Sequence, residues 1–279
     1  MNRLLIIDGH NLLFQMFFGM PSKIIGAQGK AIHGVIGFIG ALNRLADTYH
    51  PTHLVVMFDG EKQNPRKNIL EEYKANRPDY SKVPDDENPF IQLPIIYEAL
   101  DYMGIKHAET TDCETDDVIA AYATKYGKDN EVFISSFDSD YFQLISDNVK
   151  IIRYRGKCST VCDEKYIREK YGVAPSYYLD LKCMVGDTSD NIPGLRGIGP
   201  KTAAKLINCI GTVAHIQARC KEIESEKIRL AIEEGSDIIS RNLSLIRLDG
   251  NADMPYSLEA IEFKNPRLRT MDVIRGIGH

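Results

Sequence analysis

The chain has 279 residues, of which 43% are hydrophobic and 26% charged, a balance typical of a globular protein with one large core or two smaller ones. No apolar run approaches the length of a membrane span, and the opening MNRLLIIDGHNLL is too short an apolar run for a signal peptide, so we expect a cytoplasmic chain with six reduced cysteines. The net charge of −5 argues weakly against a nucleic-acid partner, unless the acids are gathered around divalent cations.

The first half of the sequence alternates apolar runs with helical patterns. The expected strands cover residues 3–8, 53–59, 131–138 and 149–154, and the expected helices cover residues 34–49, 88–103 and 115–126. This alternation predicts an open, mostly parallel α/β sheet, in which ligands bind at the carboxyl ends of the strands. Three of the four runs end on an acid, which places acids at that edge.

The second half changes character near residues 165–170, where the pattern becomes mainly helical with Gly-rich turns. Within it, GLRGIGPKTAAKLI resembles a helix–hairpin–helix, in which Gly197 and Gly199 permit a tight turn. Lys201 and Lys205 follow on the second helix, whose N-terminus can hold a phosphate whatever the base sequence. A Gly-rich turn between two packed helices is the simpler alternative, and the longer pattern GxGxKTAxKL favours the hairpin.

Nine acids lie near the expected strand and helix ends. They are Asp8, Asp59, Glu114, Asp116, Asp117, Asp138, Asp140, Asp187 and Asp190. If the sheet forms as expected, all nine converge on one concave site, where they cannot all stay ionised without cations. Oxygen ligands without His or Cys suit Mg²⁺ or Mn²⁺, and such a cluster fits two-metal phosphodiester hydrolysis. A single Asp at a strand end is more often a turn or cap residue, and spacing alone leaves phosphatase-like and nuclease-like chemistry open.

Basic and aromatic side chains gather in residues 62–82. They are Lys62, Arg66, Lys67, Lys74, Arg77 and Lys82, with Tyr73 and Tyr80 among them. A solvated helix is the simpler interpretation, because acids are interspersed. Beside a carboxylate cluster, a phosphate clamp with an aromatic stacking platform is favoured.

Six segments resemble the successive motifs of the bacterial and phage 5′-nucleases. They are IIDGHNLLF, MFDG, PRKNILEEYKANR, ETDD, FDSDYFQL and GDTSDNIPGLRGIGPKTAAKL, spread over roughly residues 4–207. That family includes the 5′–3′ exonuclease domain of bacterial DNA polymerase I and the flap endonucleases. The resemblance implies a PIN-like α/β core over 1–168 with a helical arch at about 62–90. A helical region over 169–279 would then hold the helix–hairpin–helix (helix-three-turn-helix) at 186–207.

The resemblance also implies roles for single residues. The first metal would be held by Asp8, Asp59, Glu114, Asp116 and Asp117, and the second by Asp138, Asp140, Asp187 and Asp190. The positions of Arg66, Tyr73, Lys74 and Arg77 match arch residues that contact the scissile phosphate. A K⁺ ion at the hairpin would be held by the backbone carbonyls of Met184, Val185, Pro193, Leu195 and Ile198. The chain departs from the family at Gln15, where an Arg is usual, and we expect a neighbour such as Lys23 to compensate or substrate binding to weaken.

The implied function is a structure-specific 5′-nuclease, a flap endonuclease and 5′–3′ exonuclease of replication and repair. It would use two Mg²⁺ or Mn²⁺ ions, act as a monomer on DNA with 5′ flaps or ends, and remain compatible with RNA–DNA hybrids. A catalytically weak DNA-structure-binding protein is the alternative, and a PIN-type ribonuclease is disfavoured by residues 186–207. The start at Met1 and the divergent end at 251–279 favour a stand-alone paralogue over a fragment.

Overall fold

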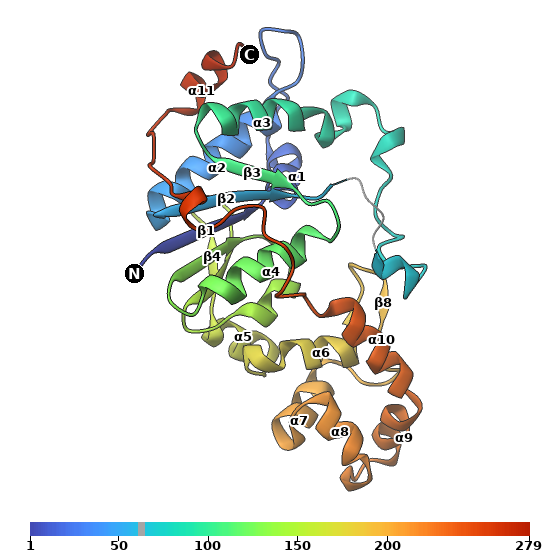
Figure 1. The fold of residues 1–279 in the computed structure, drawn as a ribbon. Helices are drawn as coiled ribbons and strands as arrows, with labels where there is room; N and C mark the ends of the chain where they lie inside the picture. The colour runs from blue at the N-terminus through green and yellow to red at the C-terminus, as the bar shows by residue number, and fades with distance from the viewer. Residues whose placement is uncertain (61–64) are drawn as a thin grey trace.

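The fold is an α/β core that continues into a helical region (Figure 1). The computed structural model describes residues 1–60 and 65–279. Lys62, one of the basic residues singled out above, lies outside the described residues. Of the helices in the described part, none is long and apolar enough to cross a membrane.

Across the described residues, the core is built on a sheet of six strands in the order β3-β2-β1-β4-β5-β6. The strands are β1 (Arg3–Asp8), β2 (His53–Phe58), β3 (Lys106–Glu109), β4 (Glu131–Ser135), β5 (Val149–Arg153) and β6 (Thr160–Cys162). β1 to β5 pair in parallel, and β6 is antiparallel to β5. The four expected strands are confirmed, whereas β3 and β6 were missed, because KHAE is half exposed and TVC has only three residues.

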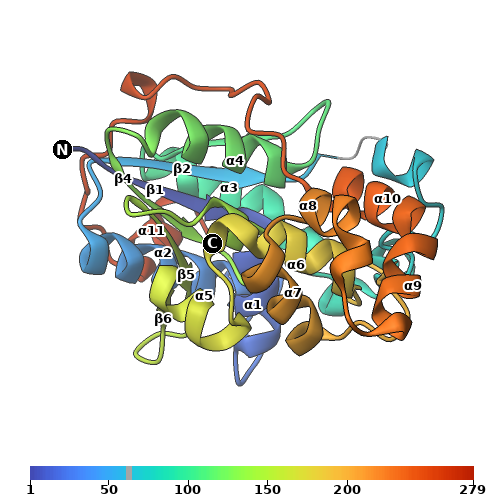
Figure 2. The same cartoon turned by 90° about the horizontal axis from the view of Figure 1, so that it is seen from below.

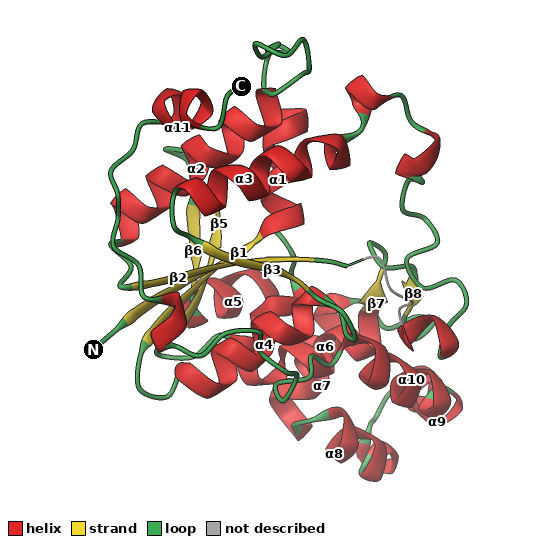
Figure 3. Ribbon diagram, turned by 45° about the horizontal axis from the view of Figure 1, so that its top comes forward, coloured by secondary structure: helices red, strands yellow, loops and turns green. Residues whose placement is uncertain are grey.

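Two layers of helices cover the sheet (Figure 3). One face carries α1 (Gly9–Gly19), α2 (His33–Tyr49), α3 (Leu93–Tyr102) and α11 (Thr270–Gly276), and the other carries α4 (Thr115–Tyr126) and the helices between residues 164 and 246. Side chains of β1 alternate between the two faces of the sheet, which explains this arrangement. Leu5 and Ile7 pack on the face covered by α1, α2 and α3, while Leu4 and Ile6 pack on the face covered by α4. All four side chains are fully buried, as expected for a parallel sheet covered on both faces.

The second half is helical, as the sequence predicts. Its helices are α5 (Glu164–Tyr171), α6 (Tyr178–Val185), α7 (Pro200–Ile210), α8 (Val213–Ala218), α9 (Glu226–Glu234) and α10 (Ser236–Ile246). A short antiparallel pair, β7 (Gly186–Asp187) and β8 (Ile192–Pro193), connects α6 to α7. α10 packs against α6 and lies beside the chain segment around residue 73 (Figures 1 and 2).

The segment between β2 and α3 differs from the helical arch that the resemblance implies. Its described residues form 3₁₀ turns at Pro65–Asn68, Tyr80–Lys82, Asp85–Glu87 and Pro89–Gln92, with no α-helix before Leu93. Pro78, Pro84 and Pro89 lack the amide N–H that a continuous helix needs, and Lys74 adopts a left-handed φ of 56°. The helix expected at 88–103 therefore begins later, at Leu93.

Candidate active site

The first acids of the site lie where β1, β2 and β4 end. Asp8 is the last residue of β1 and caps α1, and its Oδ1 accepts a hydrogen bond from Asn11 N at 3.1 Å. Its Oδ2 accepts from Ser136 Oγ, just after β4, at 2.8 Å. Asp59 follows β2, and its Oδ1 accepts from Thr115 N at the start of α4, at 3.1 Å. These bonds join three strand ends and one helix start at the point where the strand order reverses, which is the usual ligand position of such sheets.

A cleft of about 1150 Å³ opens at this edge. Four of the predicted acids line it, namely Asp8, Asp59, Asp116 and Asp138, together with Lys74 and Arg77 of the segment between β2 and α3. Aromatic rings form much of the remaining wall: His10, Phe14, Tyr80, Phe90 and Tyr97. Acids, cations and rings in one cleft suit a phosphate-bearing ligand with aromatic groups.

The other five predicted acids do not line the cleft and are paired with basic side chains. Glu114 contacts Arg66 and Lys74, and Asp117 accepts from Arg66 Nη2 at 2.8 Å. Asp190 Oδ1 accepts from Arg77 Nη2 at 3.0 Å. Lys182 pairs with both Asp140 and Asp187. All nine acids therefore lie in or near the cleft. The five that do not line it are held by ion pairs with basic residues that the acid pattern alone did not suggest.

Burial, together with the charge of neighbouring acids, raises the pKa of several of these carboxyls. Burial, with the charge of Asp59, raises the pKa of Asp8 to about 7. Burial and Asp138 raise the pKa of Asp140 to about 8, and burial holds the pKa of Asp116 well above its ordinary value. Asp59 is the exception: burial alone would raise its pKa, but hydrogen bonds from His10 and Thr115 lower it to about 2. Burial and the neighbouring acids therefore disfavour the ionised forms of Asp8, Asp116 and Asp140 in the metal-free cluster.

The donor set fits a hard divalent cation. Within residues 1–60 and 65–279, no three His, Cys, Asp or Glu side chains are already placed as a ligand set. Instead Lys74 Nζ lies 3.0 Å from Glu114 Oε1, 3.8 Å from Asp190 Oδ2 and 4.0 Å from Asp116 Oδ2. Asp140 Oδ1 is buried without a hydrogen-bond partner in the described structure, 3.4 Å from Lys182 Nζ. The candidate ligands are all oxygen atoms, one carboxylate oxygen has no hydrogen-bond partner in the described structure, and several carboxyl pKa values are raised. A bound Mg²⁺ or Mn²⁺ would stabilise the ionised carboxylates once Lys74 withdraws.

The raised pKa of Asp140 predicts a pH-dependent stability. Because its folded-state pKa of about 8 exceeds the ordinary 3.8, folding takes up a proton between these values, and the metal-free protein loses stability as pH rises through this window. Asp140→Asn removes the titration. In EDTA we expect its Tm to be close to that of the wild type at pH 5 and about 3–6 °C higher at pH 8, measured by thermal unfolding.

Asp147→Asn is the matched control, since Asp147 is exposed on the loop between β4 and β5. Its Tm difference from the wild type should not change with pH. An equal Tm difference for Asp140→Asn at pH 5 and pH 8 would contradict the raised pKa.

Tyr73 and Arg66, which were expected to contact the scissile phosphate, do not line the cleft. Tyr73 is 2% exposed among Ile192, Leu245 and Ile246, and its hydroxyl donates to Glu114 Oε2 at 3.3 Å. Its ring has no free face for a base in this structure, because apolar neighbours cover it. Arg66 is 8% exposed and bound to Glu114 and Asp117, so it orients acids and does not face the cleft.

The hairpin has the backbone that its glycines suggest. Gly197 has a φ of 83°, and Gly199 directly precedes α7, on which Lys201 and Lys205 are exposed. Three of the five predicted potassium carbonyls accept hydrogen bonds: Met184 O from Leu195 N at 2.8 Å, Leu195 O from Ile198 N at 3.1 Å, and Pro193 O from Asn242 Nδ2 at 2.9 Å. The K⁺ site remains a prediction.

Comparison with known proteins assigns the chain to a family. The family model of the 5′–3′ exonuclease N-terminal resolvase-like domain matches residues 3–172, and that of the 5′–3′ exonuclease C-terminal SAM fold matches residues 173–269. The chain belongs to the 5′–3′ exonuclease family. The predicted fold class and the predicted family are both confirmed.

Relatives of this exonuclease family include both stand-alone and polymerase-linked proteins. The 5′–3′ exonuclease of Aquifex aeolicus is 33% identical over 97% of this chain and 90% of the relative. DNA polymerase I of Bacillus subtilis is 32% identical over 94% of this chain, which spans only 29% of that polymerase. The bacteriophage T5 5′-exonuclease, solved with bound divalent zinc ions, has a TM-score of 0.72 and 25% identity over 99% of this chain and 96% of its own.

The family's usual Arg is replaced by Gln15, whose position is now defined. Its Nε2 donates to Tyr154 O at the end of β5, so the carboxamide ties α1 to the sheet edge. Lys23 pairs with Asp86 Oδ2 at 2.6 Å, on the segment between β2 and α3. In this structure Lys23 is therefore paired away from the nine candidate metal ligands, and it does not replace the missing Arg.

Several residues of the site were missed by sequence reasoning. His10 Nδ1 lies 3.2 Å from Asp59 N, Ser136 binds Asp8, Tyr141 donates to Asp116, and Lys182 forms ion pairs with Asp140 and Asp187. His10 and Ser136 carried a weak signal, since each lies two residues from a predicted ligand. Lys182 carried none, because its pairing with Asp140 depends on how α6 packs on the core.

Proposed function

We propose that the chain is a structure-specific 5′-nuclease, acting on DNA as a flap endonuclease and a 5′–3′ exonuclease. One observation carries the proposal: three acids that follow strand ends, and Asp116 in the first turn of α4, line a single cleft that also holds Lys74 and Arg77. Solved neighbours support the substrate class, since a T5 flap endonuclease complexed with DNA and metal ions has a TM-score of 0.72 and 25% identity over 99% of this chain.

In the proposed mechanism, Asp8, Asp59, Asp116 and Asp138 would hold divalent ions. Glu114, Asp140, Asp187 and Asp190 would complete the two sites once Lys74 and Lys182 shift, and Asp117 would stay with Arg66. Two bound Mg²⁺ or Mn²⁺ ions would activate a water and stabilise the leaving oxygen.

Lys74 and Arg77 are proposed to bind the scissile phosphate as Lys74 leaves the acids. Both already line the cleft, and their positive charges favour the phosphate as its charge grows in the transition state. The aromatic rings that line the cleft would stack with bases next to that phosphate. Duplex DNA would meet the hairpin and α7, with K⁺ at the hairpin carbonyls.

The biological setting is proposed to be replication and repair in the cytoplasm, by a monomer that removes flaps or primers. RNA–DNA hybrids fit the same cleft chemistry, because hydrolysis acts on the phosphodiester and not on the base. The test compares 5′-labelled flap duplex, single strand and blunt duplex in Mg²⁺. We expect cuts at the flap junction that leave a 5′-phosphate and a 3′-hydroxyl, and equal cutting of all three substrates would contradict structure specificity.

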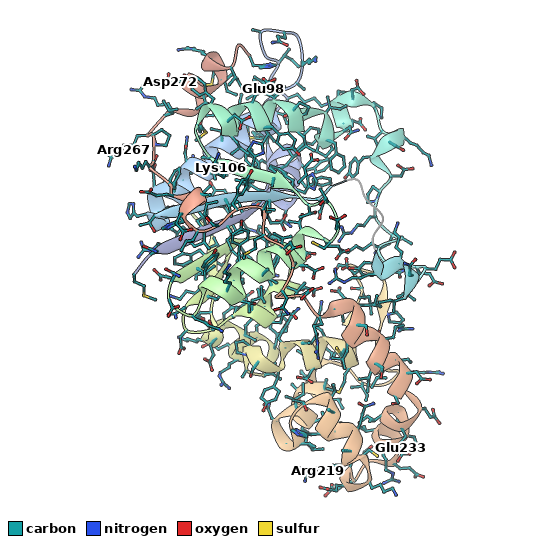
Figure 4. The ribbon with its side chains drawn as sticks, in the orientation of Figure 1. Glu98, Lys106, Arg219, Glu233, Arg267 and Asp272 are labelled. Carbon is teal, nitrogen blue, oxygen red and sulfur yellow. The ribbon has the colours of Figure 1, made fainter. Side chains whose placement is uncertain are left out.

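The proposed duplex contact predicts the effect of Lys201→Ala. The exposed ammonium would neutralise one phosphate, so its loss should weaken duplex binding alike for all sequences and reduce the slope of log K against log salt by about 1. Lys106→Ala is the control, since Lys106 is exposed at the start of β3, well apart from α7 (Figure 4). An unchanged salt slope for Lys201→Ala would remove the hairpin from the DNA contact.

A further inference from the structure

The turn that follows α10 contacts the loop that carries Asp140, through the side chain of Gln143. Gln143 Nε2 donates to Asp140 O at 2.9 Å and to Ile246 O at 3.1 Å, and its Oε1 accepts from Leu248 N at 3.2 Å. Both amide hydrogens and the oxygen are used. A reversed carboxamide would place its oxygen against two carbonyls, so the geometry fixes its orientation.

The same turn contacts the acids at the start of α4. Asp249 N donates to Asp117 Oδ1 at 2.9 Å, and Arg247 O accepts from Arg66 Nη2 at 3.1 Å. Arg66 in turn binds Asp117 and Glu114. Residues 246–249 therefore link the two groups of acids that approach the cleft from β4 and from α4.

This turn has a firm base and a defined shape. Asn242 of α10 is fully buried and donates to Cys183 O and Pro193 O, both at 2.9 Å, which fixes α10 against α6 and β8. At the other end, Asp249 Oδ1 accepts from Asn251 N at 2.9 Å, a bond that closes the turn and presents Asp249 N to Asp117.

We propose that Gln143 and residues 246–249, together called the α10 bracket, are a positioning element that sets the distance between the Asp138–Asp140 loop and the start of α4. In the described part of the chain none of the bracket's residues lines the cleft, and the bracket acts through the backbone of Asp140, the side chain of Asp117 and Arg66. Its consequence is a higher affinity of the acid cluster for divalent cations. The inference rests on the proposed function in taking these acids as metal ligands.

The first test is Mn²⁺ binding to the full, metal-free chain without DNA, followed by electron paramagnetic resonance. Gln143→Met keeps the unbranched shape and removes all three hydrogen bonds, and we expect about 10-fold weaker Mn²⁺ binding. Gln217→Met, at a half-buried Gln of α8 that bonds only Ser236 in the described structure, should bind Mn²⁺ like the wild type. Binding of flap DNA in EDTA should be unchanged in both variants. Wild-type Mn²⁺ affinity in Gln143→Met would overturn the proposal.

A second pair of variants separates turn geometry from charge and avoids the core. Asp249 is exposed, so Asp249→Ala should fold but lose the bond to Asn251 N, and weaken Mn²⁺ binding. Asp249→Asn keeps that acceptor while removing the charge, and should restore wild-type affinity. Equal losses in the two variants would overturn the positioning role.

The two proposals fail separately. A wild-type chain that binds Mn²⁺ through these acids but cuts no flap would end the proposed function, and a loss of affinity in Gln143→Met would still support the bracket. The bracket proposal alone would fail if the wild-type chain cuts flap DNA and Gln143→Met matches it both in Mn²⁺ affinity and in cutting at low Mg²⁺.

Discussion

Asp138→Ala should lower the single-turnover rate of flap cleavage at least ~100-fold while leaving flap-DNA affinity in EDTA intact. Asp138 lines the cleft, and its Oδ1 also accepts from Asp140 N at 2.8 Å, so the change would remove a proposed ligand and loosen a second acid. Its charge would contribute to holding a cation in the transition state and little to holding the DNA backbone. The rate should therefore fall at saturating DNA, as a loss of kcat and not a rise of KM.

The control for this prediction is Asp147→Ala, which removes an exposed acid from the same loop between β4 and β5. Its rate should match that of the wild type. Asp187→Ala should repeat the loss seen for Asp138→Ala, because it removes an acid of the second proposed site. Weak DNA binding with normal single-turnover chemistry in Asp138→Ala would exclude Asp138 as a metal ligand.

Lys74→Ala should lower kcat by about 100- to 1,000-fold, the usual cost of losing a group that stabilises transition-state charge. Burial opposes the charge of Lys74, yet Asp116 and Glu114 raise the pKa of its ammonium, so the side chain is charged throughout the working pH range. Its φ of 56° is unusual for a residue with a side chain, and such strain often marks a functional position.

A second measurement shows whether Lys74 competes with metal. In EDTA, Lys74→Ala leaves Glu114 and Asp190 with less positive charge nearby, so the metal-free protein should unfold at a lower temperature. In excess Mg²⁺ the difference in Tm should shrink, because the cation replaces the ammonium. Lys128→Ala, at an exposed lysine just beyond the C-terminal end of α4, should change neither rate nor Tm. A Lys74→Ala enzyme with wild-type kcat would remove Lys74 from the phosphate contact.

The strand ends could be predicted from sequence because the rule behind them is local. RLLIID, HLVVMFD and EVFISSFD each combine a buried strand with an acid, and parallel strands bring such ends together. The structure confirms this for Asp8 and Asp59, and it places Asp138 beside them in the cleft. The family and the fold class followed from the same motifs.

The counter-charges could not be predicted, because they depend on tertiary packing. Lys182 reaches Asp140 from a helix 42 positions later in the chain, and Arg66 reaches Arg247 O across 181 positions. Tyr73 looked like a stacking residue by composition, yet apolar residues of α10 cover it. The segment expected as a helical arch forms 3₁₀ turns in its described residues, because its prolines interrupt a continuous helix.

The proposed function requires that the acid cluster hold divalent cations with which the chain cuts DNA at a flap junction. Its most direct test is cleavage of a 5′-labelled flap duplex by the full chain in EDTA and across a Mg²⁺ titration, with DNA binding followed in the same samples. We expect binding without cleavage in EDTA, and junction cuts that increase with Mg²⁺. Cleavage that persists in EDTA, or intact DNA binding without cleavage in either Mg²⁺ or Mn²⁺, would contradict the proposed function. Intact binding without cleavage would favour a DNA-structure-binding protein, and Gln15→Arg would then be the first variant to examine.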